Sequence, residues 1–120
     1  MLKMTRKYTD FNGVEREEDF YFNFTKAEVA EMELGVTGGM SEMIKKIVAT
    51  KDLPSLIKIF KELVLKAYGV KSDDGRQFIK NEELSTAFAQ TQAYSDLFME
   101  LASDDKAAAD FINQVLPKVD

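Results

Sequence analysis

Residues 20–28 read FYFNFTKAE, and the hydrophobic period changes within this stretch. Its three phenylalanines alternate with other residues, which is the period-2 pattern of a strand with one buried face. Thr25 and Glu28 then form a Ser/Thr-x-x-Glu capping box, the signature of a helix that begins at Lys26. The stretch therefore predicts a strand that leads directly into a helix, with a row of phenylalanines facing the core.

Upstream of this stretch, the β-prone runs 4–11 and 14–24 flank Asn12-Gly13. Asn-Gly is the preferred pair for a two-residue type I′ turn, because both central residues need a positive φ. The two runs are therefore predicted to form a β-hairpin. Since an isolated hairpin is at best marginally stable in water, helices from the rest of the chain are expected to cover its phenylalanine row.

Downstream, the apolar residues recur with helical spacing, and capping residues divide the chain into short helices. The expected helices are 26–34, about 40–51, 53–68, and three more that begin after Asn81, Thr91 and either Ser103 or Asp104. Gly69 is expected to be the residue that ends the third helix in a left-handed conformation. Residues 70–80 are predicted to be a polar connection, with a tight turn at 72–75 and a short extended piece at Phe78-Ile79.

The chain is therefore predicted to be α+β and mostly helical, with an N-terminal β-hairpin followed by a bundle of about five to six helices. Its 120 residues match one domain, and no linker is long enough to divide it. We expect a single domain over 1–120, with the hairpin at 1–24, the helical part at 25–117 and a short tail at 118–120.

The composition excludes much enzyme chemistry. Without His and Cys, the chain lacks the usual near-neutral base, the thiolate nucleophile and the commonest zinc ligands. The net charge of −5 disfavours nucleic acid as a partner. No apolar run approaches the roughly 20 residues that span a bilayer, and no apolar signal core follows the first residues, so we expect neither a membrane partner nor secretion. The middle of the chain is basic between acidic ends, which indicates solvated helix faces, internal charge complementarity or an acidic face for a partner.

Motifs for bound ions also fail. If Gly75 is the sixth residue of a calcium loop, Val70 and Asn81 take the first and twelfth positions, where acidic ligands are required. Residues 35–39 are glycine-rich but lack the Gly-Lys-Ser/Thr ending of a phosphate loop. The paired carboxylates, such as Glu82-Glu83, fit surface or helix-cap positions. We therefore predict no catalytic residue, no cofactor and no metal.

A protein partner remains, and methionine-rich apolar helix faces suit one. The candidate contact residues are Met40, Met43, Ile44, Ile47, Ile59 and Leu65. The competing interpretation is that each of them fills the core.

The motifs taken together resemble one family. They are FYFNFTKAE (20–28), EMEL (31–34), GG (38–39), SEMI (41–44), IFKEL (59–63), KAYG (66–69), KSDDGRQFIK (71–80), FMEL (98–101) and AAADFIN (107–113). In this order they resemble the small tail assembly chaperones of long-tailed bacteriophages, especially those of Gram-positive hosts. The resemblance covers about residues 8 to 117 and rests on many ordinary residues rather than on one diagnostic motif.

The resemblance implies a non-enzymatic role in the cytoplasm of the bacterial host. Such proteins coat the long, helical tape measure protein and keep it soluble until the tail tube polymerises around it. The implied partners are the tape measure protein and then the tail tube protein. Self-association is a separate expectation, because a hairpin edge and a third helix that is apolar on two sides offer surfaces for pairing. The alternatives are a structural component of the tail or virion, and another kind of small protein-binding module.

Overall fold

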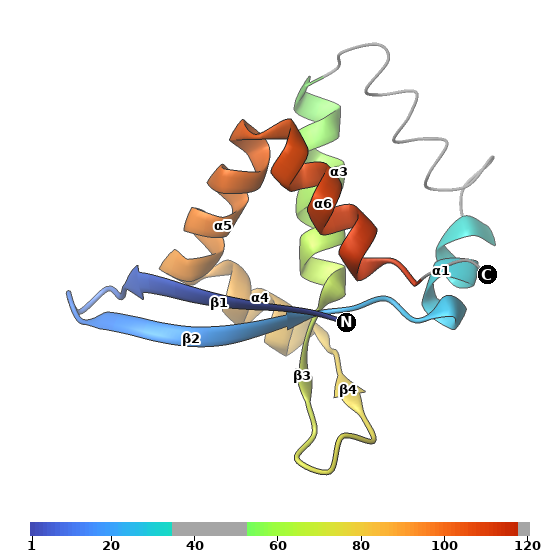
Figure 1. The fold of residues 1–120 in the computed structure, drawn as a ribbon, viewed down its shortest axis with the longest axis horizontal. Helices are drawn as coiled ribbons and strands as arrows, with labels where there is room; N and C mark the ends of the chain where they lie inside the picture. Colours follow the sequence, from blue (N-terminus) through green and yellow to red (C-terminus); the bar gives the residue numbers. More distant parts are fainter. Residues whose placement is uncertain (35–52, 118–120) are drawn as a thin grey trace.

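A computed structural model of the chain describes residues 1–34 and 53–117 (Figure 1). The described part is α+β, with one four-stranded antiparallel sheet and five helices. Its elements are β1 (Leu2–Thr9), β2 (Glu15–Phe22), α1 (Lys26–Leu34), α3 (Leu53–Ala67), β3 (Tyr68–Lys71), β4 (Phe78–Ile79), α4 (Glu82–Ala89), α5 (Gln92–Ser103) and α6 (Asp105–Val115). The expected helix at about 40–51 and the expected tail at 118–120 lie outside the described residues.

The sheet has the order β1-β2-β3-β4, and all its neighbours are antiparallel. β1 and β2 form the predicted hairpin over their whole length. β3 pairs only with the end of β2, through Tyr21 with Gly69 and Phe22 with Tyr68. The prediction that 25–117 is a helical part is therefore wrong in this region, because a second hairpin, β3–β4, extends the sheet. The expected turn at 72–75 and the extended piece at Phe78-Ile79 are confirmed as the parts of that hairpin.

The loop of the first hairpin is longer than predicted. The amide of Asp10 donates to the carbonyl of Val14 (2.9 Å), and the amide of Gly13 donates to the carbonyl of Asp10 (3.0 Å). The loop therefore has three residues, 11–13, with Gly13 at φ +80°, and the two-residue turn was wrong. The physical reason is the Asp10 side chain, whose Oδ1 accepts the amides of Asn12 and Val14 and so starts the turn one residue earlier.

The capping box forms as predicted at the start of α1. The amide of Thr25 donates to Glu28 Oε1 (2.9 Å), and the amide of Glu28 donates to Thr25 Oγ1 (3.2 Å). Lys80 reaches the same place from the second hairpin, and its Nζ lies 2.7 Å from Glu28 Oε2 and 2.5 Å from the carbonyl oxygen of Asn23. This ammonium therefore ties the second hairpin to the junction of β2 with α1.

Replacing Glu28 with glutamine tests this tie. Partial burial opposes the charge of Glu28, but hydrogen bonds from Lys80 and Thr25 outweigh it and lower the pKa of the carboxyl. Because the pKa is lower in the folded state, the ionised carboxylate stabilises the fold at pH values above the unfolded pKa. This stabilisation is lost as the pH falls through the folded pKa. We expect Glu28→Gln to lower the free energy of unfolding by about 1 kcal/mol at pH 7, a figure reduced by partial exposure. Urea titrations should show the difference shrink towards pH 3, and an equal difference at both pH values would contradict the assignment.

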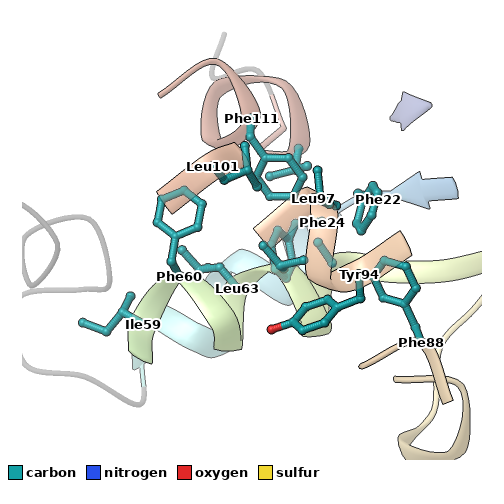
Figure 2. Close-up of a cluster of buried hydrophobic side chains, with 13 residues drawn as sticks. Phe22, Phe24, Ile59, Phe60, Leu63, Phe88, Tyr94, Leu97, Leu101 and Phe111 are labelled. Atoms are coloured by element: carbon teal, nitrogen blue, oxygen red, sulfur yellow. The ribbon is translucent and has the colours of Figure 1, made fainter. Parts of the chain in front are cut away.

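The core lies between the sheet and the helices α3, α4, α5 and α6, which contribute its buried side chains. Phe22 is fully buried and Phe24 is 2% exposed, so the predicted phenylalanine row does face the core. Side chains from all four later helices converge on it, as Figure 2 shows. The converging residues include Phe60, Leu63 and Val64 of α3, Phe88 of α4, Tyr94, Leu97 and Leu101 of α5, and Phe111 and Val115 of α6. Burial raises the pKa of Tyr94 above its ordinary value, so its hydroxyl stays neutral.

The three later helices begin at their predicted caps. The side chains of Asn81 and Thr91 accept the amides of Leu84 and Tyr94. Asp104, one of two predicted alternatives, caps the last helix by accepting two amides of its first turn. Each of these signals is local in the sequence, which is why sequence inspection located them.

The predicted end of the third helix is wrong. α3 ends at Ala67, and Tyr68 and Gly69 already belong to β3. The amide of Asn23 donates to the carbonyl of Ala67 (2.9 Å), which starts the pairing with β2. Gly69 therefore serves the sheet and does not cap the helix.

Candidate protein-interaction surface

The described residues hold no site that resembles a catalytic or metal centre. None of their charged or polar residues is buried, and no three acidic side chains gather to hold a metal. Lys80, the cation with 18% side-chain exposure, is held by Glu28 and by the carbonyl of Asn23. Its ammonium also lies 4.6 Å from the centre of the Phe24 ring. These contacts explain Lys80 as a structural residue.

The side chains of the acidic turn at 72–75 form hydrogen bonds within the turn. Asp74 Oδ1 accepts the amide of Arg76 (3.0 Å) and the hydroxyl of Ser72 (2.8 Å). These two bonds lower the pKa of Asp74 and keep it ionised. Gly75 has φ +75°, as the turn requires. The segment is an ordinary hairpin turn.

The candidate contacts from the sequence divide into two groups. Met40, Met43, Ile44 and Ile47 lie outside the described residues. Ile59 belongs to the core and is 9% exposed, and Leu65 is half-buried against the same core. In this structure both described candidates support the fold.

The structure also shows exposed apolar side chains that sequence inspection did not single out. Phe11 and Val14, at the tip of the first hairpin, are 78% and 53% exposed. Val70 and Ile79 are cross-strand partners on the second hairpin, and both are exposed. Each pair flanks or lies in a turn, and a turn signal could have predicted that exposure. Two single side chains, Ile57 on α3 and Met99 on α5, are exposed as well.

The charges of the described surface are sorted by element. α3 exposes three lysines, Lys58, Lys61 and Lys66, which accounts for part of the basic middle of the sequence. β1 carries three cations and no carboxylate, while β2 carries four carboxylates. Arg6 of β1 pairs with Glu100 of α5 and so links the sheet to the helical layer. A hydrogen bond from Thr5 and the charge of Lys3 lower the pKa of Asp19 on β2.

The described part therefore has exposed apolar and charged side chains that suit contact with a protein. In the described part, no helix has the length and apolar character needed to cross a membrane. Neither the curated proteins nor the solved structures gave a match. A family model described as phage tail assembly chaperone matches residues 1–119, which confirms the predicted resemblance to tail assembly chaperones. Because the match spans nearly the whole chain, the protein belongs to the phage tail assembly chaperone family.

Proposed function

We propose that the protein binds the tape measure protein and keeps it soluble while the tail tube assembles. The observation that supports this role is the family match over residues 1–119. The role is non-enzymatic and belongs to the host cytoplasm, before the tail is complete. The tail tube protein would then take the place of the chaperone along the tape measure protein.

The helical character of the tape measure protein suggests how the chain binds it. A long helix with one apolar face fits a helix-in-groove contact, in which side chains spaced along one face enter an apolar surface. We propose this contact at Met40, Met43, Ile44 and Ile47, whose spacing in the sequence is the spacing expected for one apolar face of a helix. Ile59 and Leu65 could contribute only if the core around them opened, since both pack in it or against it. Exposed Ile57 is an added candidate, because α3 presents it to solvent without cost to the core.

Co-purification tests the proposal and its location together. A tagged copy of the chain should retain the tape measure protein of the same phage when the two are co-expressed. Met43→Asp with Ile47→Asp should abolish retention while the far-ultraviolet circular dichroism stays unchanged. The matched control is Phe11→Asp with Val14→Asp, which places the same charges on exposed positions of the hairpin tip and should leave retention intact.

The structural alternative predicts a different result in the particle. A chaperone leaves the tail, so purified virions should contain almost none of this chain by quantitative mass spectrometry. A stoichiometric amount in the virion, with no retention of the tape measure protein, would contradict the proposal.

A further inference from the structure

The outer edge of β1 is free among the residues that the structure describes, because β1 is the first strand of the order β1-β2-β3-β4. In an antiparallel pair, hydrogen-bonded and non-bonded residue pairs alternate. The bond from the amide of Asp10 to the carbonyl of Val14 fixes this alternation for the first hairpin. Even-numbered residues of β1 therefore bond to β2, and the backbone groups of Lys3, Thr5, Lys7 and Thr9 point to the free edge.

The other side of β2 agrees with this assignment. The amide of Asn23 donates to the carbonyl of Ala67 at the start of the pairing with β3. The backbone groups of the odd-numbered residues of β2 thus point to β3, and those of its even-numbered residues point to β1. This agrees with the bond from Asp10 to Val14. Four consecutive outward positions give β1 an edge long enough to accept another strand.

The side chains along this edge are cationic. Lys3 and Lys7 lie on the exposed face, with side chains 56% and 82% exposed. Their contacts to Asp19 and Glu17 are long, at 3.6 and 3.9 Å, so both ammonium groups can take a further carboxylate. On the opposite face of β1, Leu2 and Met4 are half-buried at the rim of the core.

We propose that the free edge of β1 binds an extended segment of another protein by adding it as a strand. The segment that fits has about six residues in which acidic and apolar side chains alternate, because alternate side chains of a strand face opposite sides of the sheet. Its acidic residues lie beside Lys3 and Lys7, and its apolar residues lie beside Leu2 and Met4. This edge shares no residue with the contact proposed at 40–47.

A second copy of the chain fits the same edge poorly. If two β1 strands paired antiparallel in the register centred on Thr5, Lys3 of each copy would lie opposite Lys7 of the other. Like charges directly opposite each other destabilise a strand pair. The cationic edge therefore selects for an acidic strand and against itself.

Residue-resolved amide exchange of the full chain tests the proposal, with the peptide acetyl-Val-Glu-Val-Glu-Val-Glu-Val-amide as the probe. At a peptide concentration about ten times its dissociation constant, exchange at Thr5 and Lys7 should slow by about tenfold. Met4 and Arg6 already bond to β2 and should change little. The same peptide with lysine in place of glutamate should give no protection. Equal protection by both peptides would overturn the proposal.

Two pairs of variants separate the backbone contribution from the charges. Thr5→Pro removes an outward amide, which an edge strand tolerates, and should abolish the protection of Lys7. Thr5→Val keeps that amide and should retain the protection. Lys3→Glu with Lys7→Glu should lower the affinity for the peptide about fivefold. Lys58→Glu with Lys61→Glu makes the same charge change on α3 and should alter the affinity less than twofold.

Amide exchange of the protein without peptide is the remaining measurement. If Thr5 and Lys7 are protected without peptide, another part of the chain or a second copy occupies the edge, and the proposal is overturned. Dependence of that protection on protein concentration would identify the second copy. We expect Thr5→Pro to leave co-purification of the tape measure protein unchanged. The edge proposal and the proposed function can therefore fail separately.

Discussion

Replacing Phe22 with alanine is expected to be the most damaging single change in the described part of the chain. Phe22 is fully buried, and its ring lies 5.4 Å from that of Phe111 and 5.8 Å from that of Phe88, centre to centre. The ring thus joins the sheet to α4 and α6, and its removal leaves a cavity that rigid elements cannot close. We expect a loss of ~3–5 kcal/mol in the free energy of unfolding.

Such a loss is a large share of the ~5–15 kcal/mol that stabilises an ordinary domain. Urea denaturation followed by circular dichroism measures it. Phe11→Ala is the matched control, because it removes the same ring from a position that is 78% exposed. The control should change stability by about 0.5 kcal/mol or less. Similar losses for the two variants would show that the hairpin does not face the core in the assigned direction.

Replacing Gly69 with alanine should also destabilise the protein, by about 1–3 kcal/mol. A Cβ at this position would lie 2.8 Å from the carbonyl oxygen of Ile79 and 2.8 Å from the ring of Phe78. The first of these is a backbone atom, so β4 itself would have to move. The glycine is therefore needed for the close approach of the second hairpin, and thermal unfolding measures the cost.

Asparagine distinguishes this role from a helix cap. A left-handed cap accepts asparagine better than alanine, whereas a crowded strand position rejects the larger side chain. We expect Gly69→Asn to be at least as destabilising as Gly69→Ala. Gly75→Asn is the control, because Gly75 has φ +75° and open space around its Cα, and it should cost about 1 kcal/mol or less. A Gly69→Asn variant more stable than Gly69→Ala would restore the cap assignment.

The parts of the fold that sequence inspection predicted are those with local signals. The capping box at Thr25, the caps at Asn81, Thr91 and Asp104, and the alternation before Phe24 each depend on neighbours within four residues. β3 could not be predicted in this way, because its pairing joins residues near 21 to residues near 69. Gly69 follows an amphipathic helix, and the sequence therefore predicts a helix cap. The strand pairing shows that Gly69 lies in β3 instead. The Asn-Gly pair alone predicts a two-residue loop, but the hydrogen bonds to the Asp10 side chain produce a loop of three residues.

The interaction surface was harder to predict than the fold. An apolar residue with helical spacing is the same signal whether it packs inward or faces a partner, and Ile59 and Leu65 pack on the core. Phe11 was assigned to a strand, whereas the three-residue loop places it at the exposed tip. The free edge of β1 follows from strand order, which the sequence of the hairpin alone does not contain.

The solubility of the tape measure protein tests the central claim most directly. The tape measure protein of the same phage would be expressed alone, with this chain, and with its Phe22→Ala variant, and the soluble fraction would be measured by quantitative immunoblot after high-speed centrifugation. We predict that the intact chain moves most of the tape measure protein into the soluble fraction in proportion to its dose, and that the variant does not. An unchanged soluble fraction at every dose of well-folded chain would contradict the claim.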